Sequence, residues 1–320
     1  MAFPNVSDIV ATTIEKRTKK IQDNVRLNNA LLTYIEDRGN TRTFSGGSLI
    51  YEELSFAENS NAGWYSGYDQ LPVAAQDVLS AAQYDIKQAA VPVVISGLDE
   101  LKNSGPEQMI DLMEGRMKVA EATMANLIAA AIYSDGTAAG GKQLIGLDAM
   151  VPVTPTTGVY GGIDRATWTF WRSKVTNAGA LTSATIQAAM NQMWADLVRG
   201  MDRPDLLVMD NLFWTMYMSS LQPQQRFTDP KKANLGFETV KFQSADVVLD
   251  GGIGGFATQN TCFFLNTKFM YYRPHSKRNQ VPLSPNRRYA INQDAEVQIL
   301  AFAGNMTCSG AQYLGRLIKT

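Results

Sequence analysis

The only histidine of this 320-residue chain, His275, is the first residue to test for catalysis. A Ser–His–Asp or Cys–His nucleophile would have to be built around it. The chain contains no G-x-S-x-G motif, and the residues around His275 resemble a strand that ends in a loop. We therefore expect an ordinary surface histidine and no catalytic site.

Two glycine-rich stretches match nucleotide-binding loops only in part. Residues 136–143 match most of the sequence motif of a phosphate-binding loop, but they follow a predicted helix instead of a strand. Gln143 also stands where a Ser or Thr would hold magnesium. Residues 247–255 lack the G-x-G-x-x-G spacing, and residues 256–260 do not look like the start of a helix. We expect residues 136–143 to form a turn after the helix and residues 247–255 to form a loop between strands. We expect no bound cofactor.

Composition indicates a globular protein with much buried surface. Apolar residues make up 45% of the chain and charged residues 18%, against about a quarter in an average protein. The net charge of −1 does not favour nucleic acid or a membrane surface as a partner, and no apolar run approaches the length of a membrane span. Cys262 and Cys308 have neither metal-ligand spacing nor a disulfide pattern, so we expect reduced thiols in a cytosolic fold.

Three aromatic residues, Trp64, Tyr65 and Tyr68, lie close together in a segment rich in Gly, Asn and Ser. They could stack on nucleic acid bases, but no basic residue lies between Ser45 and Lys87 to neutralise phosphates. Two interpretations remain: packing inside a short local hairpin, or contact with a neighbouring subunit. We prefer the second, because aromatic side chains are favoured anchors of interfaces.

Charge is distributed unevenly along the chain. Residues 46–90 hold six acidic residues and one base, whereas residues 251–293 hold six bases and no acid. Two unrelated solvated faces would explain these counts, but so would an acidic segment of one copy lying on a basic surface of another. The residues predicted to contact a neighbouring subunit are Glu52, Glu53, Glu58, Trp64, Tyr65, Tyr68, Asp69, Arg273, Lys277, Arg278, Arg287 and Arg288.

The elements around these residues begin with a long extended excursion. Residues 48–56 and 82–87 have strand composition, and the second stretch alternates strictly between apolar and polar residues. Residues 91–95 predict a fully apolar core strand. Residues 106–134 repeat apolar side chains at i, i+3 and i+4, which predicts one amphipathic helix roughly 43 Å long. An excursion this long cannot bury itself in its own domain, so it must lie on something else, most simply on another copy.

The remaining pattern alternates helices and strands. Helices are expected at 29–38, 185–199 and 211–221, and strands at 143–151, 205–210, 245–249, 262–265, 269–272 and 295–303.

The order of these parts resembles that of a tailed-bacteriophage major capsid protein with the Hong Kong 97 fold. Residues 136–151, 204–210, 263–272 and 293–308 carry the sequence similarity. The resemblance implies an α+β fold of four parts: an amino-terminal arm, an extended β-hairpin loop, a peripheral domain with a long spine helix, and an axial domain. The corresponding ranges are 1–45 for the arm, 46–90 for the loop, 91–179 with 291–320 for the peripheral domain (spine helix 106–134), and 180–290 for the axial domain.

The resemblance also implies a function without catalysis. The chain would assemble as pentamers and hexamers into an icosahedral shell that encloses double-stranded DNA without reading its sequence. It would be part of the virion capsid, assembled in the host cytoplasm, with no membrane, and with scaffolding, portal and decoration proteins as further partners. Some members form an isopeptide bond through a lysine on the loop; here only Lys87 is present, at the base, so we expect none. The loop begins by about residue 46, so we expect any scaffold to be a separate protein.

Two alternatives stay open. An encapsulin-like cellular compartment has the same fold, and cargo-peptide binding would favour it. An α/β nucleotide-dependent enzyme is the alternative from another class, and it would need one of the catalytic or phosphate-binding arrangements considered above.

Overall fold

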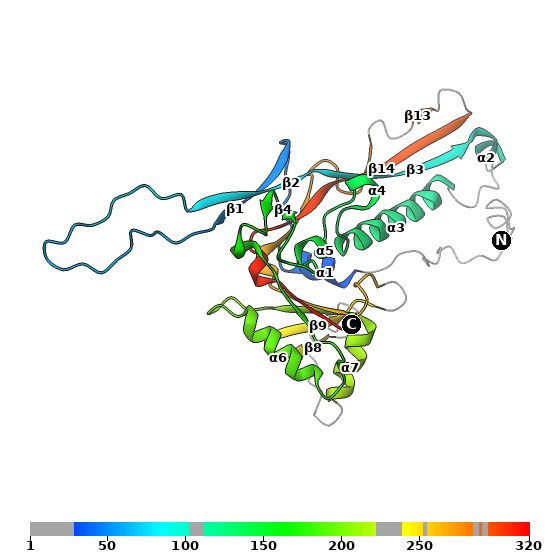
Figure 1. The fold of residues 1–320 in the computed structure, drawn as a ribbon. Helices are drawn as coiled ribbons and strands as arrows, with labels where there is room; N and C mark the ends of the chain where they lie inside the picture. Colours follow the sequence, from blue (N-terminus) through cyan, green and yellow to red (C-terminus); the bar gives the residue numbers. More distant parts are fainter. Residues whose placement is uncertain (1–28, 103–111, 222–238, 252–254, 284–287, 290–293) are drawn as a thin grey trace.

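The structure, a computed structural model, describes residues 29–102, 112–221, 239–251, 255–283, 288–289 and 294–320. In this part of the chain, a long hairpin projects from one end of an elongated body, and a lobe of helices and short strands lies below the body (Figure 1). Helices and strands are mixed, which confirms the predicted α+β class.

The hairpin consists of β1 (Leu49–Ser55) and β2 (Leu79–Asp85), which pair antiparallel. Leu49 lies opposite Asp85 and Ser55 lies opposite Leu79. Every second side chain of β1 is buried, because only one face of the hairpin rests on the body. Residues 56–78 continue beyond the strands as a long loop (Figure 1). The predicted excursion is confirmed.

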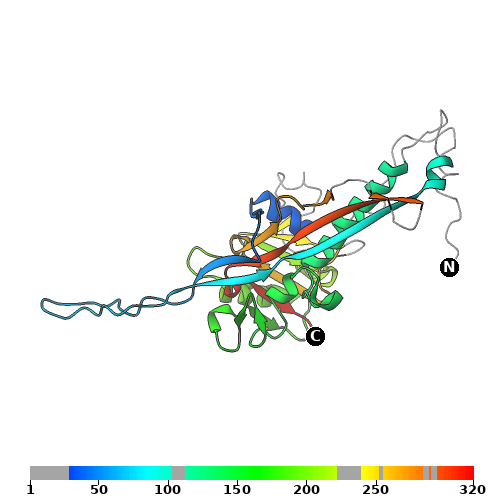
Figure 2. The ribbon, with the colours of Figure 1, turned by 90° about the horizontal axis from the view of Figure 1, so that it is seen from above.

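A long sheet forms the axis of the body. β3 (Lys87–Ser96) pairs antiparallel with β14 (Ala295–Cys308) along its whole length, and the two run side by side in Figure 2. β14 also pairs with β11 (Met270–Pro274), β12 (Val281–Pro282) and β13 (Arg288–Tyr289). The strand predicted at 91–95 lies within β3, but only one of its faces enters the core. Val93 and Ile95 are buried, whereas Val94 remains 46% exposed because β3 packs on α3 with one face only.

The predicted spine helix is α3 (Leu112–Ile132), which lies along β3 (Figure 1). The predicted start at residue 106 lies outside the described residues. Met124, Ile128 and Ile132 are fully buried, in agreement with the i, i+4 spacing of the apolar residues. A short helix, α2 (Gly97–Lys102), follows β3 at the end of the body opposite the hairpin.

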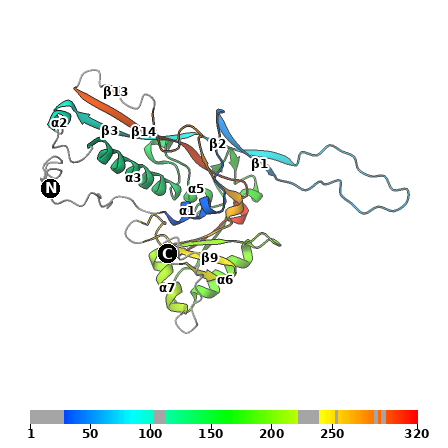
Figure 3. The same ribbon diagram turned by 180° about the vertical axis from the view of Figure 1, so that it is seen from behind.

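A six-stranded sheet forms the lower lobe, with the order β6 (Lys174–Asn177), β15 (Gly315–Ile318), β10 (Thr261–Leu265), β7 (Leu206–Met209), β9 (Ala245–Leu249) and β8 (Thr239–Phe242). Alternate residues of β7 enter two cores: Leu206 and Val208 face the core shared with the long sheet, and Leu207 and Met209 face the second core. Helices α6 (Ile186–Leu197) and α7 (Asn211–Leu221) cover that second face (Figure 3).

Short elements complete the chain. They are α4 (Ala138–Gly141), α5 (Leu147–Met150), β4 (Val159–Tyr160), β5 (Ile163–Asp164) and the 3-10 turns Thr169–Trp171, Thr267–Phe269 and Ala311–Tyr313.

Helix α1 (Ala30–Asp37) corrects part of the expected amino-terminal arm. The Asn29 side chain caps it by accepting a hydrogen bond of 2.8 Å from the Leu32 amide, and it donates to the Ala129 carbonyl of α3. Leu31 and Ile35 are fully buried in the main core. Residues 30–37 therefore pack with the body instead of extending from it.

The strand predicted at 143–151 is also wrong. The segment contains α5, and Gly146 lies against the end of α3, where a Cβ atom would come within 2.2 Å of the Ile132 carbonyl oxygen. The segment has no strand partner, yet four of its apolar residues are buried in the main core: Leu144, Leu147, Met150 and Val151.

The strand pairing crosses the predicted domain boundaries in both sheets. β6 and β15 fall in the ranges predicted as peripheral, yet both pair in the sheet of the predicted axial domain. β11 falls in the predicted axial range, yet it pairs with β14 in the long sheet. The division into peripheral and axial domains stays a prediction.

Candidate assembly surfaces

The aromatic residues of the loop lie in water. Trp64 and Tyr68 are fully exposed, at 105% and 106% of their reference surface, and Tyr65 is 67% exposed. Packing in the core of a short local hairpin, the first of the two interpretations, does not occur within the subunit. Glu53, Glu58 and Asp69 are exposed as well. The loop thus presents aromatic and acidic side chains without a basic residue.

Polar contacts within the loop hold its shape. At the tip, the Asp69 carboxylate accepts a hydrogen bond of 2.8 Å from the Ser66 amide, across a turn in which Gly67 has a φ of +52°. The Asn61 side chain donates to the Ala74 carbonyl at 2.6 Å and links the two sides of the loop. A loop ordered before contact loses less conformational entropy on binding.

A buried ion pair fixes the base of the hairpin. Glu52 Oε1 lies 3.1 Å from Arg273 Nε, although the contact lacks hydrogen-bond geometry, and the Thr307 hydroxyl donates to the same carboxylate oxygen at 2.8 Å. The two charged side chains are only 7% and 17% exposed. Glu52 and Arg273 were both predicted to contact a neighbouring subunit; instead they pair with each other inside one chain.

Of the other predicted basic residues, Lys277 and Arg278 make no contact with the acidic loop in the part of the chain that the structure describes. Lys277 and Arg278 are exposed in the turn after β11, where the Arg278 amide donates to the His275 carbonyl at 3.1 Å. Arg288 is in β13, opposite Val297, and Arg287 lies outside the described residues. Their pairing with a second copy stays a prediction.

Exposed apolar side chains also lie on β3, α2 and α3. Val94 of β3, Leu98 and Leu101 of α2, and Val119 of α3 are about half exposed or more. The sequence does not predict these exposures, because apolar periodicity shows which side of an element is apolar and not whether its own chain covers that side.

The residues considered for catalysis have structural roles. His275 Nδ1 accepts from the Lys277 amide at 3.1 Å, and its ring packs edge-on against Phe44. Residues 136–143 form a turn after α3, in which Ala139, Gly140 and Gly141 have positive φ. Over the ranges that the structure describes, no group of three His, Cys, Asp or Glu side chains is placed to hold a metal ion.

Both thiols are buried. Burial raises the pKa of Cys262 well above its usual range and raises the pKa of Cys308 to about 12. A thiol that stays protonated is a poor nucleophile. No helix among the described residues combines the length and the apolar character that crossing a bilayer requires.

No protein-family model matches the chain, and comparison with curated protein sequences finds no match. Solved structures of similar fold exist. The capsid asymmetric unit of cyanophage A-1(L) is 16% identical with a TM-score of 0.67, over 95% of this chain and 96% of the other. The capsid of a native GTA particle is 11% identical with a TM-score of 0.61, over 94% and 95% of the two chains.

An encapsulin is also similar. The holo-SrpI encapsulin complex from Synechococcus elongatus is 7% identical with a TM-score of 0.59, over 98% of this chain and 95% of the other. These similarities cover nearly the whole of each chain at low identity, so they establish the fold. The chain has the Hong Kong 97 fold of tailed-bacteriophage major capsid proteins, as the sequence predicts.

Proposed function

We propose that this chain is the major capsid protein of a tailed bacteriophage, which assembles as pentamers and hexamers into an icosahedral shell around double-stranded DNA. The observation that carries the proposal is the projecting loop, whose Trp64 and Tyr68 side chains are entirely in water. Each large apolar side chain that moves from water into an interface contributes roughly 2–3 kcal/mol. A subunit that bears these residues gains stability by placing them on a neighbour.

The mechanism in this proposal is assembly without catalysis. The loop of one subunit lies on the next, and the apolar surface around Leu98 and Leu101 is covered by further copies. The near-neutral net charge suits a shell that encloses DNA without reading its sequence. Scaffolding, portal and decoration proteins would be additional partners, and the virion capsid the final location, after assembly in the host cytoplasm.

An encapsulin-like compartment is the second candidate, and its support is the similarity to the encapsulin of Synechococcus elongatus. The two candidates differ in what the shell contains. A phage capsid is expected in tailed particles whose DNA resists nuclease, whereas a compartment shell holds protein cargo.

Expression of the chain alone, followed by electron microscopy, tests the shared part of both candidates. We expect closed particles of uniform size. A folded monomer that stays monomeric at high concentration, and in the presence of the other structural proteins of its phage, would overturn the proposal.

A further inference from the structure

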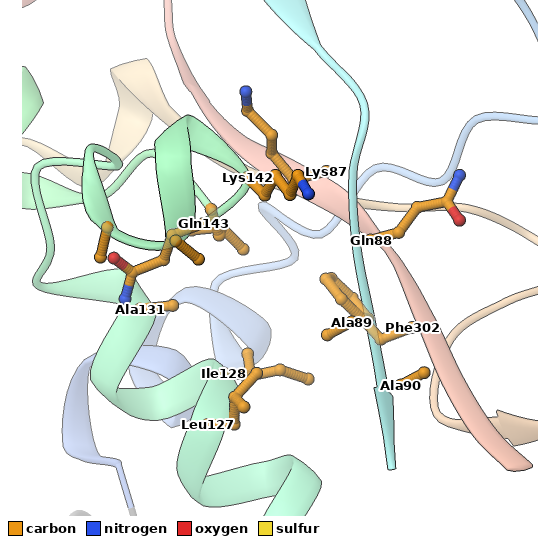
Figure 4. A pocket seen from close by; sticks show the side chains of 13 residues that line it. Lys87, Gln88, Ala89, Ala90, Leu127, Ile128, Ala131, Lys142, Gln143 and Phe302 are labelled. Carbon is orange, nitrogen blue, oxygen red and sulfur yellow. The ribbon is translucent and has the colours of Figure 1, made fainter. Parts of the chain in front are cut away.

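A cavity of about 430 Å³ lies between α3, β3 and the turn that follows α3. Its walls are mostly apolar and include Leu127 and Ile128 of α3, Ala89 of β3 and Phe302 of β14. Figure 4 shows Lys87 and Lys142 together at one end of the cavity and Leu127 and Ala90 at the other. Its volume falls within the roughly 300–1,000 Å³ of sites that enclose drug-sized groups, which is enough for an aromatic side chain.

The cavity is positively charged at its rim. Its lining contains two lysines and no carboxylate. Lys87 is already engaged, because it donates to the Gly141 carbonyl at 2.7 Å and lies 3.4 Å from the exposed carboxylate of Asp85. Lys142 is exposed and has no hydrogen bond or ion pair with any residue that the structure describes. The glycine-rich turn has positive φ at three successive residues and places Lys142, which has no partner among the described residues, beside an apolar hollow.

The loop of a second copy has the complementary properties. Residues 56–78 contain three acidic residues and no base. Asp69 lies in the tip turn next to Tyr68 and close to Trp64, and its carboxylate is held by the Ser66 amide. The loop of the same chain projects away from α3 and from the turn after it, whose residues line the cavity (Figures 1 and 3). Only another copy can bring a loop tip to this place.

We propose that the cavity between α3 and β3 receives the loop tip of a second copy, with Trp64 or Tyr68 in the apolar hollow and Asp69 against Lys142. This inference rests on the proposed function, because it assumes that copies assemble. It names the acceptor site and assigns the glycine-rich turn a role in binding. Residues 1–28 are a poorer occupant by charge, since they hold five Lys and Arg against three Asp and Glu.

Cross-linking in assembled particles tests the contact directly. Particles are formed from a mixture of isotope-labelled and unlabelled chains and treated with a carbodiimide, which joins a carboxylate to a nearby amine as an amide. We expect a peptide that links Asp69 to Lys142, with mixed labels that prove two chains. Particles in which Asp69 is linked elsewhere, or not at all, overturn the docking site and leave the shell function intact; absence of particles contradicts the shell function itself.

A charge exchange provides the second test. Lys142→Glu and Asp69→Lys are each expected to lower the yield of particles at least tenfold, and the double variant is expected to return within about threefold of the original yield. All three keep the fold, because both side chains are exposed. Lys174→Glu is the matched control, because Lys174 is an exposed lysine of β6 that lies outside the cavity. This variant is expected to leave the yield of particles unchanged, and it should not restore the yield when it is combined with Asp69→Lys. Single variants that assemble normally, or a double variant without recovery, contradict the pairing.

Discussion

Glu52 and Arg273 form a buried ion pair, with Oε1 and Nε 3.1 Å apart, between the hairpin and the long sheet. Glu52 is on β1 and Arg273 is on β11, so the pair joins segments more than 200 residues apart in sequence. The Thr307 hydroxyl of β14 completes the contact. The pair is therefore one of the buried contacts that fix the direction in which the loop leaves the body, beside the Tyr84 hydroxyl of β2, which donates to the Cys308 carbonyl at 2.7 Å.

Arg273→Met is expected to destabilise the dissociated subunit by about 3 kcal/mol, because it leaves the Glu52 carboxylate buried without its cation. The double variant with Glu52→Gln is expected to recover part of this loss, since no charge then remains buried. Denaturant unfolding of the dissociated subunit measures both. Lys268→Met is the matched control: its pair with Asp202 is exposed, so little change is expected. Equal unfolding midpoints for the original chain and Arg273→Met would show that the pair does not hold the hairpin.

Replacing Trp64 and Tyr68 together by Ser is expected to separate assembly from folding. Neither side chain is covered by its own chain, so the free energy of unfolding of the subunit should change by no more than about 0.5 kcal/mol. Particle formation should require a much higher protein concentration, because the apolar surface that a neighbour would bury is gone. Light scattering across a concentration series measures the threshold. A large loss of subunit stability would mean that these residues pack within their own chain.

The buried thiols make alkaline pH destabilising. Cys308 has a pKa of about 12 in the folded chain, raised from about 9 mainly by burial. Above pH 9 the unfolded chain releases the proton and the folded chain keeps it, so the free energy of unfolding falls as the pH rises towards 12. Cys308→Ala should lose less stability over this interval than the original chain.

A thiol reagent tests the same burial independently of pH. Neither cysteine should react in the folded subunit at neutral pH, and both should react in denaturant. Rapid labelling of the native subunit would contradict the burial of both residues.

Much of the fold follows from local sequence patterns. The strict alternation around Ala82 predicts a half-buried strand, and the spacing of Met117, Met124 and Ile128 predicts the spine helix. Both are local periodicities, and both are confirmed. Residues 91–95 show the limit of this reasoning: five apolar residues in a row do not reveal that one face of the strand would lack a covering layer.

The candidate contacts depend on long-range geometry, which the sequence expresses less directly. Counting charges identified the acidic hairpin and the basic segment, but it could not show that Glu52 and Arg273 meet within one chain. Likewise, Lys142 was considered only as part of an incomplete phosphate-binding motif. Its position beside Leu127 and Phe302 depends on the packing of α3 against the long sheet, and no local pattern encodes that packing.

Asp250 provides a test of the core at acidic pH. Its carboxylate is buried and accepts a hydrogen bond from the Tyr133 hydroxyl. Burial raises its pKa above the usual range, and the contacts from Tyr133 and the Phe256 backbone offset this only in part. The folded chain therefore binds this proton more tightly than the unfolded chain, and the ionised carboxylate lowers stability at neutral pH. This penalty is relieved as the pH falls through the folded pKa towards the unfolded value of about 3.9.

Asp250→Asn removes the ionisation and keeps an acceptor for Tyr133. The stability of the original chain relative to this variant should therefore rise on acidification, as measured by denaturant midpoints of the dissociated subunit at about pH 7 and about pH 4.5. Asp164→Asn is the matched control of opposite sign, because hydrogen bonds from the Ala166 amide and the Thr167 hydroxyl lower the pKa of the Asp164 carboxyl. The original chain should therefore keep its stability relative to that variant down to about pH 4.5 and lose it only as the pH falls through the unfolded value of about 3.9. If both variants respond to acid in the same direction, burial does not control the pKa of Asp250.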